Sequence, residues 1–316
     1  MCPRSSRGEG ILTSHHWSIN SIQYCGLCSG DWAQPVSVCG VKSAFMSRER
    51  TFRSEAIVMR RTDFGEADRL LTLYGREQGK FRAVAKGARK PQSRKTGHVE
   101  LFMRTQFMLA EGRDLPIVTQ AEMVDAYPAL REDLVRTTYA SYAVELLDRF
   151  APDEEKNPRL YDLLAAALSW FTTSDNLLMA ARTYELRLLT IAGFQPQLFH
   201  CVRCLDPIQE QDQFFSAELG GILCPNCREG DRKARPISAA AVKVLRYLQS
   251  RDWKTVQALN LKRPLHSELE TLMHFYLTYH LERNLKSVDF LHHLRREATL
   301  FAPAGDGEQT TVEEEQ

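Results

Sequence analysis

Hydrophobic and polar positions follow two different periods along the chain, and the change falls near residue 127. Before it, short apolar runs alternate with turn-forming residues, a pattern typical of β-strands. The runs predicted as strands are residues 56–59, 70–74, 81–86, 99–109 and 116–124. Because a sheet of about five short strands avoids open edges by closing on itself, we predict a small barrel within residues 47–127.

Beyond residue 127 the apolar positions recur every three or four residues, which predicts amphipathic helices. The predicted helices cover residues 135–150, 160–171, 177–191, 238–249 and 264–284. Asn157 before Pro158 is typical of a helix start, and Gly193 with Pro196 indicates a helix end. The chain is thus predicted to be an α+β multidomain protein whose second domain, residues 128–300, is helical.

The two ends of the chain follow neither period. Residues 1–46 mix Ser, Gly, Cys, His and Trp, and a regular pattern begins just after Met46. We interpret them as a spurious extension ahead of a true start at Met46, or alternatively as a disordered arm. Residues 301–316 are acidic and contain no Lys or Arg, so a disordered tail is expected there.

Composition fits a globular protein, since 43% of the 316 residues are hydrophobic and 26% are charged. The net charge of +1 predicts nothing about partners. No apolar run reaches the ~20 residues that cross a bilayer, and the start lacks a secretory segment. A cytoplasmic protein with no membrane association is expected, and in that reducing compartment paired cysteines are first interpreted as metal ligands.

Four cysteines have the spacing of a zinc ribbon. Cys201, Cys204, Cys224 and Cys227 form two C-x2-C pairs separated by 19 residues. A hairpin turning at Gly220 and Gly221 would bring the pairs together around one tetrahedral ion. Four thiolates leave no position for water, so we predict a structural Zn²⁺ in a ribbon at residues 197–230, inserted in the helical domain. Leu205 and Arg228 stand where many ribbons have Gly, which predicts a looser site.

Other interpretations of the cysteines stay open. The four residues could be buried free thiols. A second metal site could use Cys25, Cys28 and Cys39 with His15 and His16, although their spacing is poor. A zinc-dependent nucleic-acid enzyme such as a deaminase or a nuclease is a further alternative, but the His-x-Glu partner of a deaminase is missing.

Basic residues cluster just after the predicted third strand begins. Between Gln78 and Val99 there are seven of them and no acid. They are Lys80, Arg82, Lys86, Arg89, Lys90, Arg94 and Lys95. Gly and Pro are expected to keep residues 87–97 out of regular structure. A cationic loop beside a small barrel favours binding of a nucleic-acid backbone over the alternative, a solvated charged face.

Three aromatic residues near this loop have two possible roles. Phe64, Tyr74 and Phe81 could stack on bases, or they could belong to the core of the barrel, which is the commoner fate of such residues.

No catalytic motif was found. Residues 75–81 look like a phosphate-binding loop but have three residues between the glycines, and Phe81 stands where Ser or Thr should bind Mg²⁺. His274 and His280 lie in a predicted helix without a partner motif. We therefore predict that the protein is not an enzyme.

Four segments together resemble a known family. Residues 56–74 read AIVMRRTDFGEADRLLTLY, residues 77–80 read EQGK, residues 85–94 read AKGARKPQSR, and residues 184–196 read YELRLLTIAGFQP. This combination resembles the RecO family of bacterial recombination mediators over about residues 51–296. The resemblance implies an N-terminal OB fold, a C-terminal helical domain and an inserted zinc ribbon.

The resemblance also implies a function in DNA repair and homologous recombination, in the RecF pathway at the nucleoid. Family members bind single- and double-stranded DNA and anneal complementary strands. They bind the C-terminal tail of the single-stranded-DNA-binding protein and act with RecR to load RecA. That tail is acidic and apolar, so it needs an apolar groove rimmed by cations, for which Arg182 and Arg187 are predicted. An OB-fold adaptor in transcription or translation is the alternative function.

Overall fold

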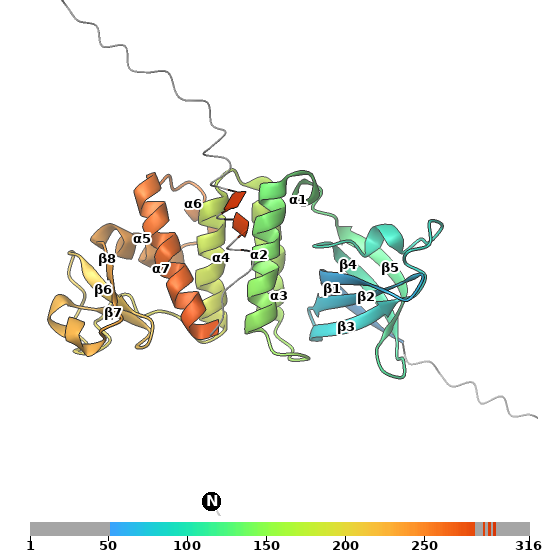
Figure 1. The fold of residues 1–316 in the computed structure, drawn as a ribbon, viewed down its shortest axis with the longest axis horizontal. Helices are drawn as coiled ribbons and strands as arrows, with labels where there is room; N and C mark the ends of the chain where they lie inside the picture. Colours follow the sequence, from blue (N-terminus) through green and yellow to red (C-terminus); the bar gives the residue numbers. More distant parts are fainter. Residues whose placement is uncertain (1–50, 282–286, 288–289, 292, 295–316) are drawn as a thin grey trace, which may run out of the picture. The chain divides into compact units, whose positions relative to one another are not determined.

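The structure is a computed structural model that describes residues 51–281, 287, 290–291 and 293–294 (Figure 1). The predictions made for residues 1–46 and 301–316, including the alternative metal site, lie outside the described residues.

The first domain is a closed barrel of five strands. These are β1 (Thr51–Phe64), β2 (Asp68–Gly75), β3 (Gly79–Ala85), β4 (Arg104–Ala110) and β5 (Ile117–Asp125). Their order is β1-β2-β3-β5-β4, and β4 pairs back onto β1. All neighbours are antiparallel except β3 and β5. The predicted five-stranded barrel is confirmed, and it is OB-like.

Buried and solvated side chains alternate along the strands, so each strand turns one face to the barrel's core and the other to solvent. In β3, for example, Phe81, Ala83 and Ala85 are buried while Arg82 is exposed. The strand predicted over residues 99–109 begins only at Arg104, so its first part was wrong. Phe102 has a φ of 67°, which interrupts an extended strand. The backbone N–H of Phe102 bonds to the carbonyl of Val58 at 2.9 Å, so residues 99–103 form a turn against β1.

The second domain is helical, as predicted. Its helices are α1 (Ala129–Glu132), α2 (Leu134–Phe150), α3 (Pro158–Thr173), α4 (Leu177–Ile191), α5 (Ala239–Ser250), α6 (Trp253–Val256) and α7 (Arg263–Leu281). Asn157 caps α3 through its side chain, with Pro158 at the first position. The prediction for residues 282–284 lies outside the described part. Among the helices described, none is long and apolar enough to span a membrane.

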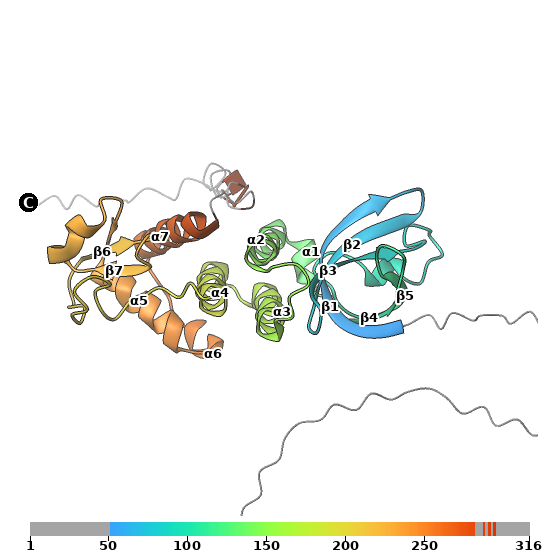
Figure 2. The ribbon, with the colours of Figure 1, turned by 90° about the horizontal axis from the view of Figure 1, so that it is seen from below.

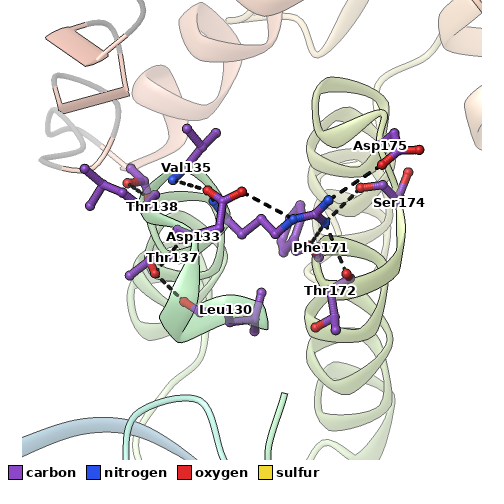
Figure 3. Close-up of polar contacts among 11 residues, drawn as sticks. Leu130, Asp133, Val135, Thr137, Thr138, Phe171, Thr172, Ser174 and Asp175 are labelled. Atoms are coloured by element: carbon purple, nitrogen blue, oxygen red, sulfur yellow. Dashed lines mark hydrogen bonds and ion pairs between the residues drawn. The ribbon is translucent and has the colours of Figure 1, made fainter. Parts of the chain in front are cut away.

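Helices α2, α3 and α4 lie side by side (Figures 1 and 2). Asp133 caps α2 by accepting the backbone N–H of Val135 at 2.7 Å. The guanidinium of Arg136 crosses to the end of α3, where it donates to the carbonyls of Phe171 at 2.5 Å and Ser174 at 2.9 Å (Figure 3). A cation at the C-terminus of α3 satisfies carbonyls that the helix itself leaves free.

The cysteine-bearing segment folds as a small sheet between α4 and α5. It contains β6 (Gln213–Ser216), β7 (Gly221–Leu223), a 3-10 helix at Pro225–Gly230, and β8 (Arg235–Ile237), with β6 in the centre. The hairpin turn predicted at Gly220 is confirmed, with a φ of 72° that suits glycine. Strand β8 was not predicted, because three residues with a central Pro236 give no period.

Two clusters of buried residues form the core. One fills the barrel and includes Leu71, Leu73 and Phe107. The other runs from β1 through the helices to the ribbon, where it includes Phe215 and Ile222. Because the ribbon shares the core of the helical domain, its folding and that of the helices are coupled.

Candidate nucleic-acid interface and metal centre

The basic loop, residues 86–97, is built from consecutive turns. The backbone N–H of Lys90 bonds to the carbonyl of Gly87 at 3.1 Å, and that of Ser93 bonds to Lys90 at 2.9 Å. Inside the loop, the Thr96 hydroxyl donates to the carbonyl of Ala88 at 2.7 Å. The prediction of irregular structure is confirmed except at its end, where Thr96–His98 is a single 3-10 turn.

This loop is fastened to the tip of the β1–β2 hairpin, residues 63–68. The contacts are the Arg89 N–H to the Ala67 carbonyl (2.9 Å), the Gly87 N–H to the Asp68 carboxylate (2.7 Å), the Arg89 guanidinium to the Gly65 carbonyl (3.2 Å), and an ion pair between Arg89 and Asp63 (3.4 Å). Two of these contacts use backbone N–H groups of the loop, so the loop is held against the barrel.

The seven predicted DNA-binding residues differ in accessibility. Arg82, Lys86, Arg89, Lys90 and Arg94 are exposed, whereas Lys80 and Lys95 are half-buried. The ammonium of Lys80 pairs with Asp148 at 3.3 Å and Asp153 at 3.0 Å. That of Lys95 donates to the carbonyl of Val118 at 2.9 Å. Both amines already have protein partners, and so does the guanidinium of Arg89, which contacts Gly65 and Asp63. Of the seven, the exposed cations without an ion-pair partner among the described residues are Arg82, Lys86, Lys90 and Arg94.

The loop also borders an open hollow of about 520 Å³, which is lined by Lys86, Gly87, Lys90, Pro91, Gln92 and Ser93. Neither ammonium has an ion-pair partner among the residues that the structure describes. Two unneutralised cations at a small concavity attract an anion such as a phosphate.

The three aromatic candidates separate into two groups. Tyr74 and Phe81 are buried, with 0% and 9% of their surface exposed, so they belong to the core and the stacking role is wrong for them. Burial raises the pKa of Tyr74 to about 12. Phe64 is 54% exposed at the hairpin tip.

The metal centre brings the four predicted cysteines together. Their sulfur atoms all lie within 4.8 Å of one another, and Cys204 Sγ lies 3.8 Å from Cys224 Sγ. A tetrahedral ion about 2.3 Å from each sulfur separates the sulfurs by about 3.8 Å. The arrangement therefore fits a metal ion held by four thiolates.

Hydrogen bonds from backbone N–H groups favour the thiolate form of Cys201. The backbone N–H of Cys224 donates to Cys201 Sγ at 3.4 Å. Burial of Cys201 would raise the pKa of its thiol, but this bond and others from backbone N–H groups lower it to about 6. The thiolate is the form that binds a metal.

Only one of the two expected departures from ribbon geometry affects the backbone. Leu205 has a φ of 64°, in the left-handed region that glycine prefers, whereas Arg228 does not have positive φ. The Leu205 N–H still bonds to the Cys201 carbonyl at 3.0 Å, so the turn forms with a residue that strains it.

Arg182 is not on the surface, so the rim position predicted for it is wrong. Its guanidinium pairs with the Glu185 carboxylate at 2.7 Å, and the two side chains are 6% and 0% exposed. The Tyr142 hydroxyl donates to the same carboxylate at 2.5 Å. A helical period cannot distinguish a buried ion pair from a surface cation, because both use the same residue types.

Arg187 lines a groove between α3 and α4. The groove has a volume of about 410 Å³, and Leu163, Ala166 and Ile191 contribute its apolar surface. Arg159 lines it as well, although the sequence analysis did not identify this residue. The guanidinium of Arg187 lies over the Trp170 ring at 5.2 Å. The groove thus combines apolar surface with two cations and one carboxylate, Asp162, which pairs with Arg76 at 3.2 Å.

These features define a class of protein, in which an OB-like barrel with an anchored cationic loop precedes a helical domain that carries a four-cysteine ribbon. Family models identify the family. The model for the N-terminal part of recombination protein O matches residues 46–127, and that for its C-terminal part matches residues 131–289. The chain belongs to the RecO family.

Curated relatives agree with this assignment. A protein of Roseiflexus sp. named DNA repair protein RecO is 42% identical over 264 residues, which are 84% of this chain and 93% of that protein. A protein of the same name from Pelotomaculum thermopropionicum is 37% identical over 258 residues, 82% of this chain and 98% of that one. The family supports a role in DNA repair and recombination.

Proposed function

We propose that the protein is a recombination mediator that binds single- and double-stranded DNA and anneals complementary strands without catalysing a covalent reaction. It would help load RecA onto DNA coated by the single-stranded-DNA-binding protein, together with RecR. The observation that carries the proposal is the basic loop, whose exposed cations are fastened to an OB-like barrel.

The physical basis of annealing is charge. Two DNA strands repel each other through their phosphates, and a protein that neutralises phosphates lowers this repulsion. Lys86 and Lys90 border the hollow of the loop, and Arg94 lies beyond it. Because these side chains contact the backbone and not the base edges, bases stay available for pairing.

Zinc would be held by Cys201, Cys204, Cys224 and Cys227, and we propose a structural role for it. An ion saturated by four thiolates offers no position to a substrate. The alternative of a zinc-dependent nucleic-acid enzyme requires an open position, which four sulfur atoms within 4.8 Å of one another do not provide.

The groove between α3 and α4 is the proposed docking place for the acidic, apolar tail of the single-stranded-DNA-binding protein. Its apolar surface would take the tail's hydrophobic side chains, and Arg187 and Arg159 would pair with its carboxylates. Replacing Arg187 with Glu should weaken binding of a tail peptide, measured by fluorescence anisotropy, and Lys262→Glu is a control outside the groove.

The central test replaces Lys86, Lys90 and Arg94 with Glu. None of the three has an ion-pair partner in the part of the chain described, so the fold should persist. Losing three phosphate contacts should lower the slope of log K against log salt by about 2 for single strands. Annealing of complementary oligonucleotides should fall in parallel.

A matched control carries the same change of charge elsewhere. Lys254, Lys262 and Arg263 are also exposed and can be replaced together with Glu. Equal losses in both triple variants would mean that only the net charge matters, and the loop would not be the DNA site. Normal annealing by the loop variant would remove the mediator proposal and favour the adaptor alternative.

A further inference from the structure

Phe64 is an aromatic side chain left on the surface at the last residue of β1, with 54% of its area exposed. Two other aromatic residues of the same hairpin and the next strand, Tyr74 and Phe81, are in the core. The ring therefore contributes little to the barrel's core. A solvated ring at the point where the cationic loop is fastened suits contact with another molecule.

Arg89, a residue of the loop, contacts the two residues that flank Phe64 in the sequence. Its guanidinium donates to the carbonyl of Gly65 at 3.2 Å and pairs with Asp63 at 3.4 Å, so it contacts the residues before and after Phe64. Backbone bonds from Gly87 and Arg89 to the hairpin tip hold the loop in place. The residues on either side of Phe64 are consequently joined to the cationic loop.

Carboxylates at the hairpin tip would repel a phosphate, but two of the three have protein partners. Asp63 pairs with Arg89 at 3.4 Å and with Arg69 at 3.7 Å. Asp68 accepts the Gly87 N–H at 2.7 Å. Glu66 is exposed to solvent, and the bond from Gly87 does not neutralise Asp68, so two negative charges at the tip stand against Lys86, Lys90 and Arg94 of the loop.

We infer that Phe64 and the basic loop form a site for an unpaired nucleotide, in which the ring stacks on the base and the loop cations pair with the flanking phosphates. This inference rests on the proposed function and adds to it that the site prefers single-stranded to double-stranded DNA. In a duplex both faces of each base are covered by neighbouring bases, whereas in a single strand a face is free. Cations contact either form, so the ring supplies the preference for single strands.

The test compares Phe64→Ala with the full wild-type chain in binding to an oligothymidylate and to a duplex of equal length at one ionic strength. Stacking contributes ~1–3 kcal/mol per base, so the affinity for the single strand should fall roughly 5- to 150-fold. The affinity for the duplex should not change. Phe64→Leu keeps an apolar side chain and should lose as much as Phe64→Ala, while Phe64→Trp should bind like wild type.

Tyr279→Ala is the matched control, because it removes another exposed aromatic ring, on α7, and should leave both affinities unchanged. Equal losses for single strand and duplex, or normal binding by Phe64→Leu, would overturn the stacking site. If Phe64→Ala binds normally while the loop variant does not, the mediator proposal stands and this inference fails. If wild-type protein binds neither oligonucleotide, both fail.

Discussion

The ion pair between Arg182 and Glu185 illustrates how a single residue can be assigned to the wrong part of the molecule. Both side chains are buried in α4, and the Tyr142 hydroxyl donates to the same carboxylate oxygen, Oε1, that pairs with Arg182. The cost of burying two charges is offset only while both partners are present. The role of Arg182 is therefore expected in stability and not in partner binding.

Replacing Arg182 with Met should destabilise the protein by about 3–5 kcal/mol, because it removes the guanidinium that pairs with the buried Glu185 carboxylate. Urea unfolding would measure the loss. The double variant Arg182→Met/Glu185→Gln should recover much of it, since the unpaired charge is then absent. A stable single variant that fails to bind the tail peptide would instead support the original rim assignment.

His280 gives a prediction for pH. Burial lowers the pKa of its imidazole below the ordinary 6.5, and its ring lies 4.5 Å from the rings of Phe194 and Tyr276. The unfolded chain then binds the proton more readily than the folded one. The stabilising contribution is complete above pH 6.5 and is lost as the pH falls through the lowered pKa of the folded state.

The urea midpoint of the wild-type chain should therefore decrease between pH 7.5 and 5.5, with zinc in excess at both values so that metal loss does not contribute. His280→Gln should show a smaller decrease because it has no proton to gain. An identical pH dependence in both proteins would mean that other groups cause the effect.

At the scale of elements, polar contacts join the start of α2 to the end of α3. Arg136, near the start of α2, donates to carbonyls at the end of α3 and also lies 3.7 Å from Asp175 (Figure 3). One side chain thus satisfies carbonyls that α3 leaves free and joins two consecutive helices through partners 35 and 38 residues away in sequence.

Arg136→Met should lower the free energy of unfolding by about 1.5–3 kcal/mol, the range for hydrogen bonds to charged groups. Arg131→Met on α1 removes an exposed cation and should change stability little. Both values come from the same urea titration. A midpoint for Arg136→Met equal to that of the control would show that water replaces the guanidinium without cost.

At the scale of the whole molecule, most buried barrel residues form a core of their own and only a few, such as Ile57 and Tyr74, join the helical core, whereas the ribbon shares the core of the helices. Damage to the metal centre should therefore spread into the helical domain and spare the barrel. The location of the damage therefore distinguishes a structural zinc ion from a zinc ion that takes part in DNA binding.

Replacing Cys204 and Cys227 with Ser should abolish zinc binding, measured by atomic absorption, and lower the melting temperature of the helical domain. Binding of oligonucleotides by the basic loop should persist at temperatures where the barrel is folded. Loss of DNA binding with unchanged melting would contradict the structural role and place the ribbon in the DNA site.

Features that depend on local period and spacing could be predicted from the amino-acid sequence. The five strands, the main helices and the cap at Asn157 follow from alternation, amphipathic stripes and capping chemistry. The cysteine spacing was enough to predict that four sulfur atoms lie close together, because a hairpin sets the distance between the two C-x2-C pairs. The basic loop could also be predicted, because its cations follow one another closely in the sequence after Gln78.

Which side chains face solvent could not be predicted in this way, because it depends on packing between distant segments. Lys80 and Lys95 were indistinguishable in sequence from their neighbours, but packing gave each of them a partner. It likewise buried Arg182 and Tyr74 and left Phe64 exposed. The physical reason is that exposure depends on which distant segments cover a residue, and no period within the chain records those contacts.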